Sequence, residues 1–111
     1  MPIAMRKPLK ELAIRHFKRL GYTVELDVEI DDPAGRSHKV DMLVKRGDEV
    51  RPVWLKNWRR TVGVNVVISV DTEAEELGLG RPFLIGTRFS ERARSYASRK
   101  GITLLTPDDL Y

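Results

Sequence analysis

Residues 22–56, YTVELDVEIDDPAGRSHKVDMLVKRGDEVRPVWLK, contain three runs in which apolar and polar side chains alternate. The first run covers residues 22–30, the second 38–45 and the third about 50–56. Alternation with a period of two is typical of half-buried β-strands. Both connections are short and rich in turn-forming residues, so the stretch predicts an antiparallel meander of three strands.

Helical patterns lie on both sides of the meander. Before it, Pro8 opens a stretch with apolar residues at helical spacing, which predicts a helix over residues 8–20 that ends at Gly21. After it, residues 61–77 allow a helical face, although their β-branched content also suits a strand. We favour the helix.

The C-terminal third predicts a strand over 82–87, a helix over 91–100, a strand over 102–105 and a final helical turn at 106–110. The order α-β-β-β-α-β-α-β indicates an α/β fold in which a central mixed sheet is flanked by helices. A length of 111 residues suits one domain that covers residues 1–111.

Composition excludes several classes of protein. The chain has no cysteine and two histidines, so a disulfide scaffold, a thiolate metal site and a thiol nucleophile are ruled out. Its longest apolar stretch, Val62–Val70, is too short to span a membrane, and Met1–Lys10 shows no secretory signal, so we expect a cytoplasmic protein with no membrane partner. Many arginines and few amides suggest a thermophilic source, although high genomic GC content explains the arginines equally well.

The net charge of +4 is distributed in blocks of alternating sign along the chain. Such blocks suggest a basic face that attracts phosphates, and an evenly solvated surface is the alternative. The candidates for phosphate contact are Arg36, Lys45, Arg46, Arg59 and Arg60. We therefore expect DNA as a partner if these cations share a face.

Three residues could form a phosphodiester-cleaving site. Asp41 lies on the second predicted strand, Lys56 shares a face of the third strand with Trp54, and Glu11 lies on the first helix. Carboxylates hold a divalent metal in such sites and a lysine orients the attacking water. Individually these residues could be an ordinary strand carboxylate, a solvated cation and a helix-surface ion pair with Arg15.

Four segments resemble an Mrr-like restriction endonuclease domain of the PD-(D/E)xK nuclease superfamily, which includes the archaeal Holliday junction resolvases. These segments are Leu20-Gly21-Tyr22, Lys39–Gly47, Val53–Trp58, and Phe89–Ala93 with Gly101-Ile102. The resemblance implies a restriction-endonuclease-like three-layer fold, a DNA substrate and a Mg²⁺ or Mn²⁺ cofactor.

Within this resemblance, Asp41 matches the first acid of the motif, Lys56 its lysine and Glu11 the helical glutamate of some members. The resemblance thus implies Asp41, Lys56 and Glu11 as catalytic residues, and Asp41 and Glu11 as metal ligands. The second acid should stand two residues before the lysine, where this chain has Trp54. We therefore expect weak or absent binding of Mg²⁺ or Mn²⁺, unless Glu11 or Glu25 is recruited as a replacement.

Three functions remain open. The leading hypothesis is a DNA-binding domain of the nuclease fold whose cleavage is weak or lost. The alternatives are an active metal-dependent endonuclease or junction resolvase acting as a homodimer, and a protein-interaction module. The last would need an exposed apolar patch, for which Val62–Val70 is the candidate.

Overall fold

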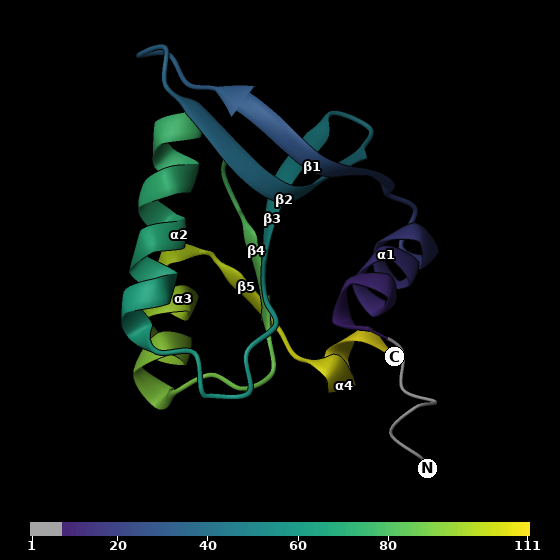
Figure 1. Ribbon diagram of the computed structural model, residues 1–111, viewed down its shortest axis with the longest axis vertical. Coiled ribbons are helices and arrows are strands. Elements are labelled where there is room, and N and C mark those ends of the chain that lie inside the picture. Colours follow the sequence, from purple (N-terminus) through teal and green to yellow (C-terminus); the bar gives the residue numbers. More distant parts are fainter. Residues whose placement is uncertain (1–7) are drawn as a thin grey trace.

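The computed structural model describes residues 8–111 and confirms the predicted order of elements (Figure 1). The elements are α1 (Leu9–Arg19), β1 (Thr23–Asp31), β2 (Ser37–Arg46), β3 (Glu49–Lys56), α2 (Val64–Leu77), β4 (Phe83–Gly86), α3 (Glu91–Lys100), β5 (Thr103–Leu105) and α4 (Pro107–Leu110). Residues 1–7, on which the expected absence of a secretory signal partly rests, lie outside the described residues. Within residues 8–111, no helix is both long enough and apolar enough to cross a bilayer.

The five strands form one mixed sheet in the order β1-β2-β3-β4-β5. The pairs β1–β2 and β2–β3 are antiparallel, which confirms the predicted meander. The pairs β3–β4 and β4–β5 are parallel, because α2 and α3 return the chain to the same end of the sheet.

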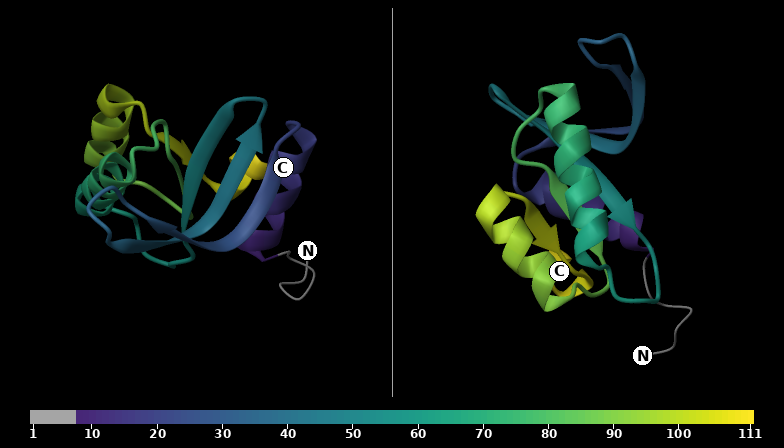
Figure 2. Two further views of the ribbon diagram at one scale, coloured as in Figure 1. Left: turned by 90° about the horizontal axis from the view of Figure 1, so that it is seen from above. Right: turned by 90° about the vertical axis from the view of Figure 1, so that its left-hand side faces the viewer.

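Helices cover both faces of the sheet and make three layers. Figures 1 and 2 show α1 and α4 on one side and α2 and α3 on the other. The core under α1 includes Phe17 and Val53, and the core under α2 and α3 includes Trp54 and Val67. Neighbouring residues of β3 thus serve opposite cores, as strand alternation requires.

The ambiguous segment 61–77 is a helix from Val64 onward, with Gly78 in the left-handed conformation at its end. Tertiary packing outweighs the β-branched content, because the buried residues of α2 recur at helical spacing. Val62 is fully buried before the helix, and Ile68 is 39% exposed. Most of the apolar side chains in the suggested interaction patch are therefore at least partly buried against the sheet and α3.

The strands β2 and β3 separate part-way along their length. Their paired register runs from Arg46↔Glu49 to Met42↔Val53. Beyond that point β2 continues beside β1, whereas β3 continues beside β4. One further step of the register would place Asp41 opposite Trp54, so the separation opens the sheet at the predicted site.

Candidate active site

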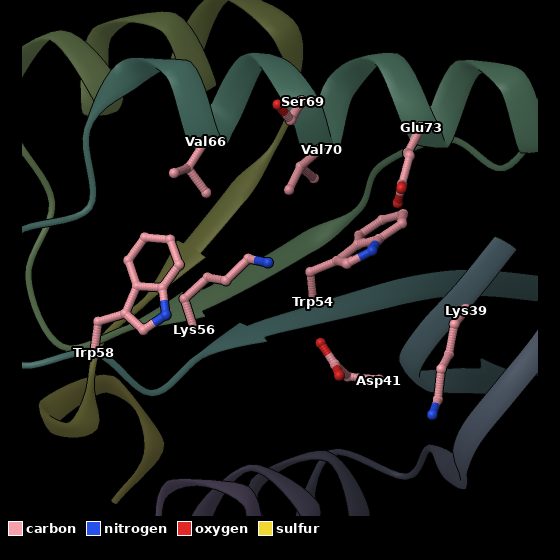
Figure 3. Close-up of a pocket in the computed structure, with 9 residues that line it drawn as sticks. All are labelled: Lys39, Asp41, Trp54, Lys56, Trp58, Val66, Ser69, Val70 and Glu73. Atoms are coloured by element: carbon pink, nitrogen blue, oxygen red, sulfur yellow. The ribbon is translucent and has the colours of Figure 1, made fainter.

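A pocket of about 330 Å³ lies beneath α2 where β2 and β3 separate (Figure 3). Its lining residues come from two strands, the segment after β3 and one helix: Lys39, Asp41, Trp54, Lys56, Trp58, Val66, Ser69, Val70 and Glu73. The structure therefore brings Asp41 and Lys56, predicted from different strands, into one pocket.

Asp41 is held by a backbone hydrogen bond. Its Oδ2 atom accepts from the N–H of Leu55 at 2.8 Å, across the separation of the two strands. This bond replaces a ladder bond that β2 can no longer provide, because the register has ended at Met42↔Val53. Asp41 is the only carboxylate that the sheet contributes to the pocket lining. One of its two oxygens is therefore already used in a structural hydrogen bond.

Trp54, which stands where the resemblance places the second acid, forms part of the pocket wall. It is only 5% exposed and packs in the same core as Val67 and Val70 of α2. Figure 3 shows its indole between the Asp41 side of the pocket and the Glu73 side chain, which extends from α2. An apolar ring thus occupies the place where a second strand carboxylate would stand.

Cations and aromatic rings alternate at the other side of the pocket. The Lys56 ammonium extends between the two indoles, with Nζ 5.7 Å from the centroid of the Trp58 ring (Figure 3). The Arg60 guanidinium carbon lies 4.4 Å from the same centroid. Both distances suit cation–π attraction, which holds positive charge around Trp58 at this side of the pocket.

The two glutamates considered as replacement acids are not among the lining residues of this pocket. Glu11 is exposed on α1, whose buried face packs on the opposite side of the sheet. Glu25 pairs with Lys45 at 2.8 Å between Oε2 and Nζ. Neither residue is brought to Asp41 by this arrangement.

Instead, α2 supplies four lining residues, two apolar and two polar, that the sequence analysis did not assign to the site. Val66, Ser69, Val70 and Glu73 line the pocket, and they stand at positions i, i+3, i+4 and i+7 of one helix. That spacing places them on one face of the helix. The sequence pattern therefore indicated a shared face once residues 61–77 were taken as a helix.

The five predicted DNA-contacting cations lie at three places. Arg36 is exposed in the β1–β2 turn, with Nε 3.8 Å from Oδ2 of Asp32. Lys45 and Arg46 end β2, where Arg46 stacks on Tyr22 at 4.3 Å. Both already have acidic partners, Glu25 for Lys45 and Glu49 for Arg46 at 3.2 Å. Arg59 and Arg60 come directly after Trp58, a lining residue of the pocket, and Arg60 stacks on that indole.

The mixed five-stranded sheet flanked by helices agrees with what comparison with known proteins finds. A family model described as restriction endonuclease, Mrr_cat, matches residues 6–111. The chain belongs to the Mrr_cat restriction endonuclease family. A search of curated proteins finds no significant match to this chain.

Three solved structures share the fold of the Mrr_cat chain. A protein of unknown function, AF1548, aligns with a TM-score of 0.80 and 16% identity over 91% of this chain and 62% of its own. VC1899 from Vibrio cholerae aligns with a TM-score of 0.62 and 18% identity over 78% of this chain and 24% of its own. A repair endonuclease from Pyrococcus abyssi aligns with a TM-score of 0.60 and 22% identity over 92% of this chain and 48% of its own. This chain therefore spans less than two thirds of each of these proteins, and identities this low establish the fold alone.

Membership of a nuclease family implies a divalent metal such as Mg²⁺ or Mn²⁺. These hard cations need oxygen ligands, commonly from one or two carboxylates together with substrate phosphate. On the sheet, the pocket offers Asp41 alone, with one oxygen already bonded to Leu55, and Trp54 fills the second position. The strand residues therefore do not fit the paired-carboxylate site of this nuclease motif.

Proposed function

We propose that this domain binds DNA and that its metal-dependent cleavage is weak or lost. The observation that carries the proposal is the buried Trp54 indole in the pocket wall beside Asp41. A site with one partly committed strand carboxylate binds a hard cation weakly. The chain nevertheless has Lys56 in the pocket and Arg60 beside it, and cations of this kind commonly contact phosphate.

Arg59 and Arg60 are the strongest candidates for DNA contact among the five predicted cations. They directly follow Trp58 of the pocket wall in the sequence, and Arg60 is stacked on Trp58, which reduces the side-chain entropy lost when a phosphate binds. Lys45 and Arg46 are weaker candidates, because Glu25 and Glu49 already compensate their charge. The net charge of +4 supports long-range attraction to a polyanion.

A supercoiled-plasmid nicking assay with Mg²⁺ or Mn²⁺ tests the loss of cleavage. We expect the wild type to nick no faster than Asp41→Asn, a variant that keeps an oxygen acceptor for the Leu55 N–H. Nicking that is robust in the wild type and abolished in Asp41→Asn would overturn this part of the proposal. Binding to labelled duplex DNA, followed by fluorescence anisotropy, tests the other part independently.

Glu73 favours the alternative, an active endonuclease. Its side chain lines the same pocket as Asp41 and is half-buried on α2, so the helix provides a carboxylate that the strand lacks. Under this alternative, Glu73→Gln would abolish nicking as completely as Asp41→Asn. Under our proposal, neither substitution changes a rate that is already at background.

A further inference from the structure

A second polar cluster lies at the tip of the β1–β2 hairpin, outside the pocket. Asp32 stands in the turn after β1, His38 is the second residue of β2, and Glu76 lies near the end of α2. Figure 1 shows the hairpin tip beside that end of the helix. Residues far apart in the sequence are thus joined at one point between the hairpin and α2.

The three side chains converge through one atom each. His38 Nε2 lies 2.7 Å from Asp32 Oδ2 and 3.6 Å from Glu76 Oε2, and all three atoms lie within 4.8 Å of one another. Bonds of about 2.0–2.2 Å at a tetrahedral angle separate two ligands of one Zn²⁺ ion by roughly 3.3 Å. The observed spacings bracket that value, so small side-chain movements would bring the atoms into position.

Burial and hydrogen bonding fix the two ligands on the hairpin. The side chains of Asp32 and His38 are 2% and 10% exposed. Asp32 uses Oδ1 to accept the backbone N–H groups of Ala34 and Arg36, both at 2.9 Å, and so directs Oδ2 at His38. The hydrogen bond from His38 is the largest cause that lowers the pKa of Asp32.

We propose that Asp32, His38 and Glu76 bind one Zn²⁺ ion. An imidazole nitrogen combined with two carboxylates suits zinc better than magnesium, which prefers oxygen ligands alone. The two carboxylates balance the charge of the ion, and water completes the coordination. Binding requires the lone pair of Nε2, so a proton on that atom is released or moves to Nδ1.

One cation already stands near this cluster. Arg36 Nε lies 3.8 Å from Asp32 Oδ2, but the Arg36 side chain is 73% exposed and free to move toward solvent when the ion enters. The bound ion would tie the hairpin to α2, the elements that also contribute Lys39 and Glu73 to the pocket wall. It would therefore stabilise the folded chain by binding to the native state alone.

Calorimetric titration of the untagged chain with Zn²⁺ tests the proposal, with Glu76→Gln as the variant and Glu75→Gln as its control. Both substitutions remove one charge from the same turn of α2, but Glu75 is outside the cluster. Changes in groups that only support a ligand cost about 10–100-fold in affinity, so the loss of a ligand in Glu76→Gln should weaken binding at least about tenfold. Glu75→Gln should bind as the wild type does.

The second histidine provides a further control, because His16 lies on α1 and is not part of the cluster. We expect His38→Asn to remove binding and His16→Asn to retain it. No saturable binding at micromolar Zn²⁺, equal affinity of the two glutamate variants, or dependence on His16 would each overturn the site. None of these outcomes bears on DNA binding or cleavage at the pocket.

Discussion

The Oδ2 atom of Asp41 accepts a hydrogen bond from the backbone N–H of Leu55 at 2.8 Å, across the point where β2 and β3 separate. The contact joins the predicted motif acid to the residue directly before Lys56, the predicted motif lysine. Asp41 therefore has a structural role that is independent of any reaction. An Asp41→Ala variant would remove the structural hydrogen bond and the candidate metal ligand together, so a loss of function in it could not be assigned to either role.

Stability separates the two roles of Asp41. We expect Asp41→Ala to lower the free energy of unfolding by about 1–3 kcal/mol, because it leaves the part-buried Leu55 N–H without its acceptor. Asp41→Asn should cost less, since an amide oxygen can still accept. Urea denaturation of the two variants measures the difference, and equal losses would mean that the hydrogen bond contributes little.

Restoring an acid at position 54 should restore metal binding. We expect Trp54→Glu to bind Mn²⁺ at least about tenfold more tightly than Trp54→Gln, because only the former adds a carboxylate beside Asp41. Both variants should lose about 3–5 kcal/mol of stability, since Trp54 is 5% exposed in the core. Calorimetry on variants shown to be folded by circular dichroism compares the two affinities. Equal affinities would show that position 54 does not supply the second ligand.

DNA binding should depend steeply on salt. With three phosphates neutralised, by Lys56, Arg59 and Arg60, the slope of log affinity against log salt concentration should be roughly −3, and Arg59→Ala/Arg60→Ala should flatten it by about 2. A homodimer would double both values. The matched control is Lys45→Ala/Arg46→Ala, which removes cations that already have acidic partners and should change the slope less. Fluorescence anisotropy across a salt series measures the DNA affinity of the wild type and both double variants. An unchanged slope in Arg59→Ala/Arg60→Ala would show that these two arginines do not contact DNA.

Stability should fall on acidification because two carboxyls titrate below their usual range. Hydrogen bonds from His38 and the Arg36 backbone lower the pKa of Asp32, and the Tyr22 hydroxyl is the largest cause that lowers the pKa of Glu49. A lowered folded-state pKa adds stability that is fully present above the unfolded value of about 4 and is lost as the pH falls through the folded value.

Asp32→Asn should therefore reduce the slope of unfolding free energy against pH in the acid range. The amide can still accept the turn N–H groups at Oδ1, so the hairpin tip should keep its conformation. Urea titrations from pH 3 to pH 6 measure the slope in each protein. The same slope in wild type and variant would show that Asp32 does not cause the acid sensitivity.

The sequence by itself determined the order of the elements and the pairing of the meander. Alternating runs such as residues 22–30, and stop signals such as Gly21, are local properties that a single segment expresses without its neighbours. Strand alternation also allowed the faces that carry Asp41 and Lys56 to coincide, but the register that brings the two residues into one pocket is known only from the structure. The family followed from the order of these same motifs.

Only the tertiary structure decided which residues surround Asp41 and which meet at the hairpin tip. Glu73 reaches the pocket, and Glu76 reaches His38, because α2 crosses the sheet at a particular position and rotation. That placement results from the packing of Val67 and Val70 against the sheet and against α3. These contacts join residues that are distant in the sequence. Local periodicity identifies the buried face of a helix, but the position of that helix over the sheet depends on how the whole core fills space.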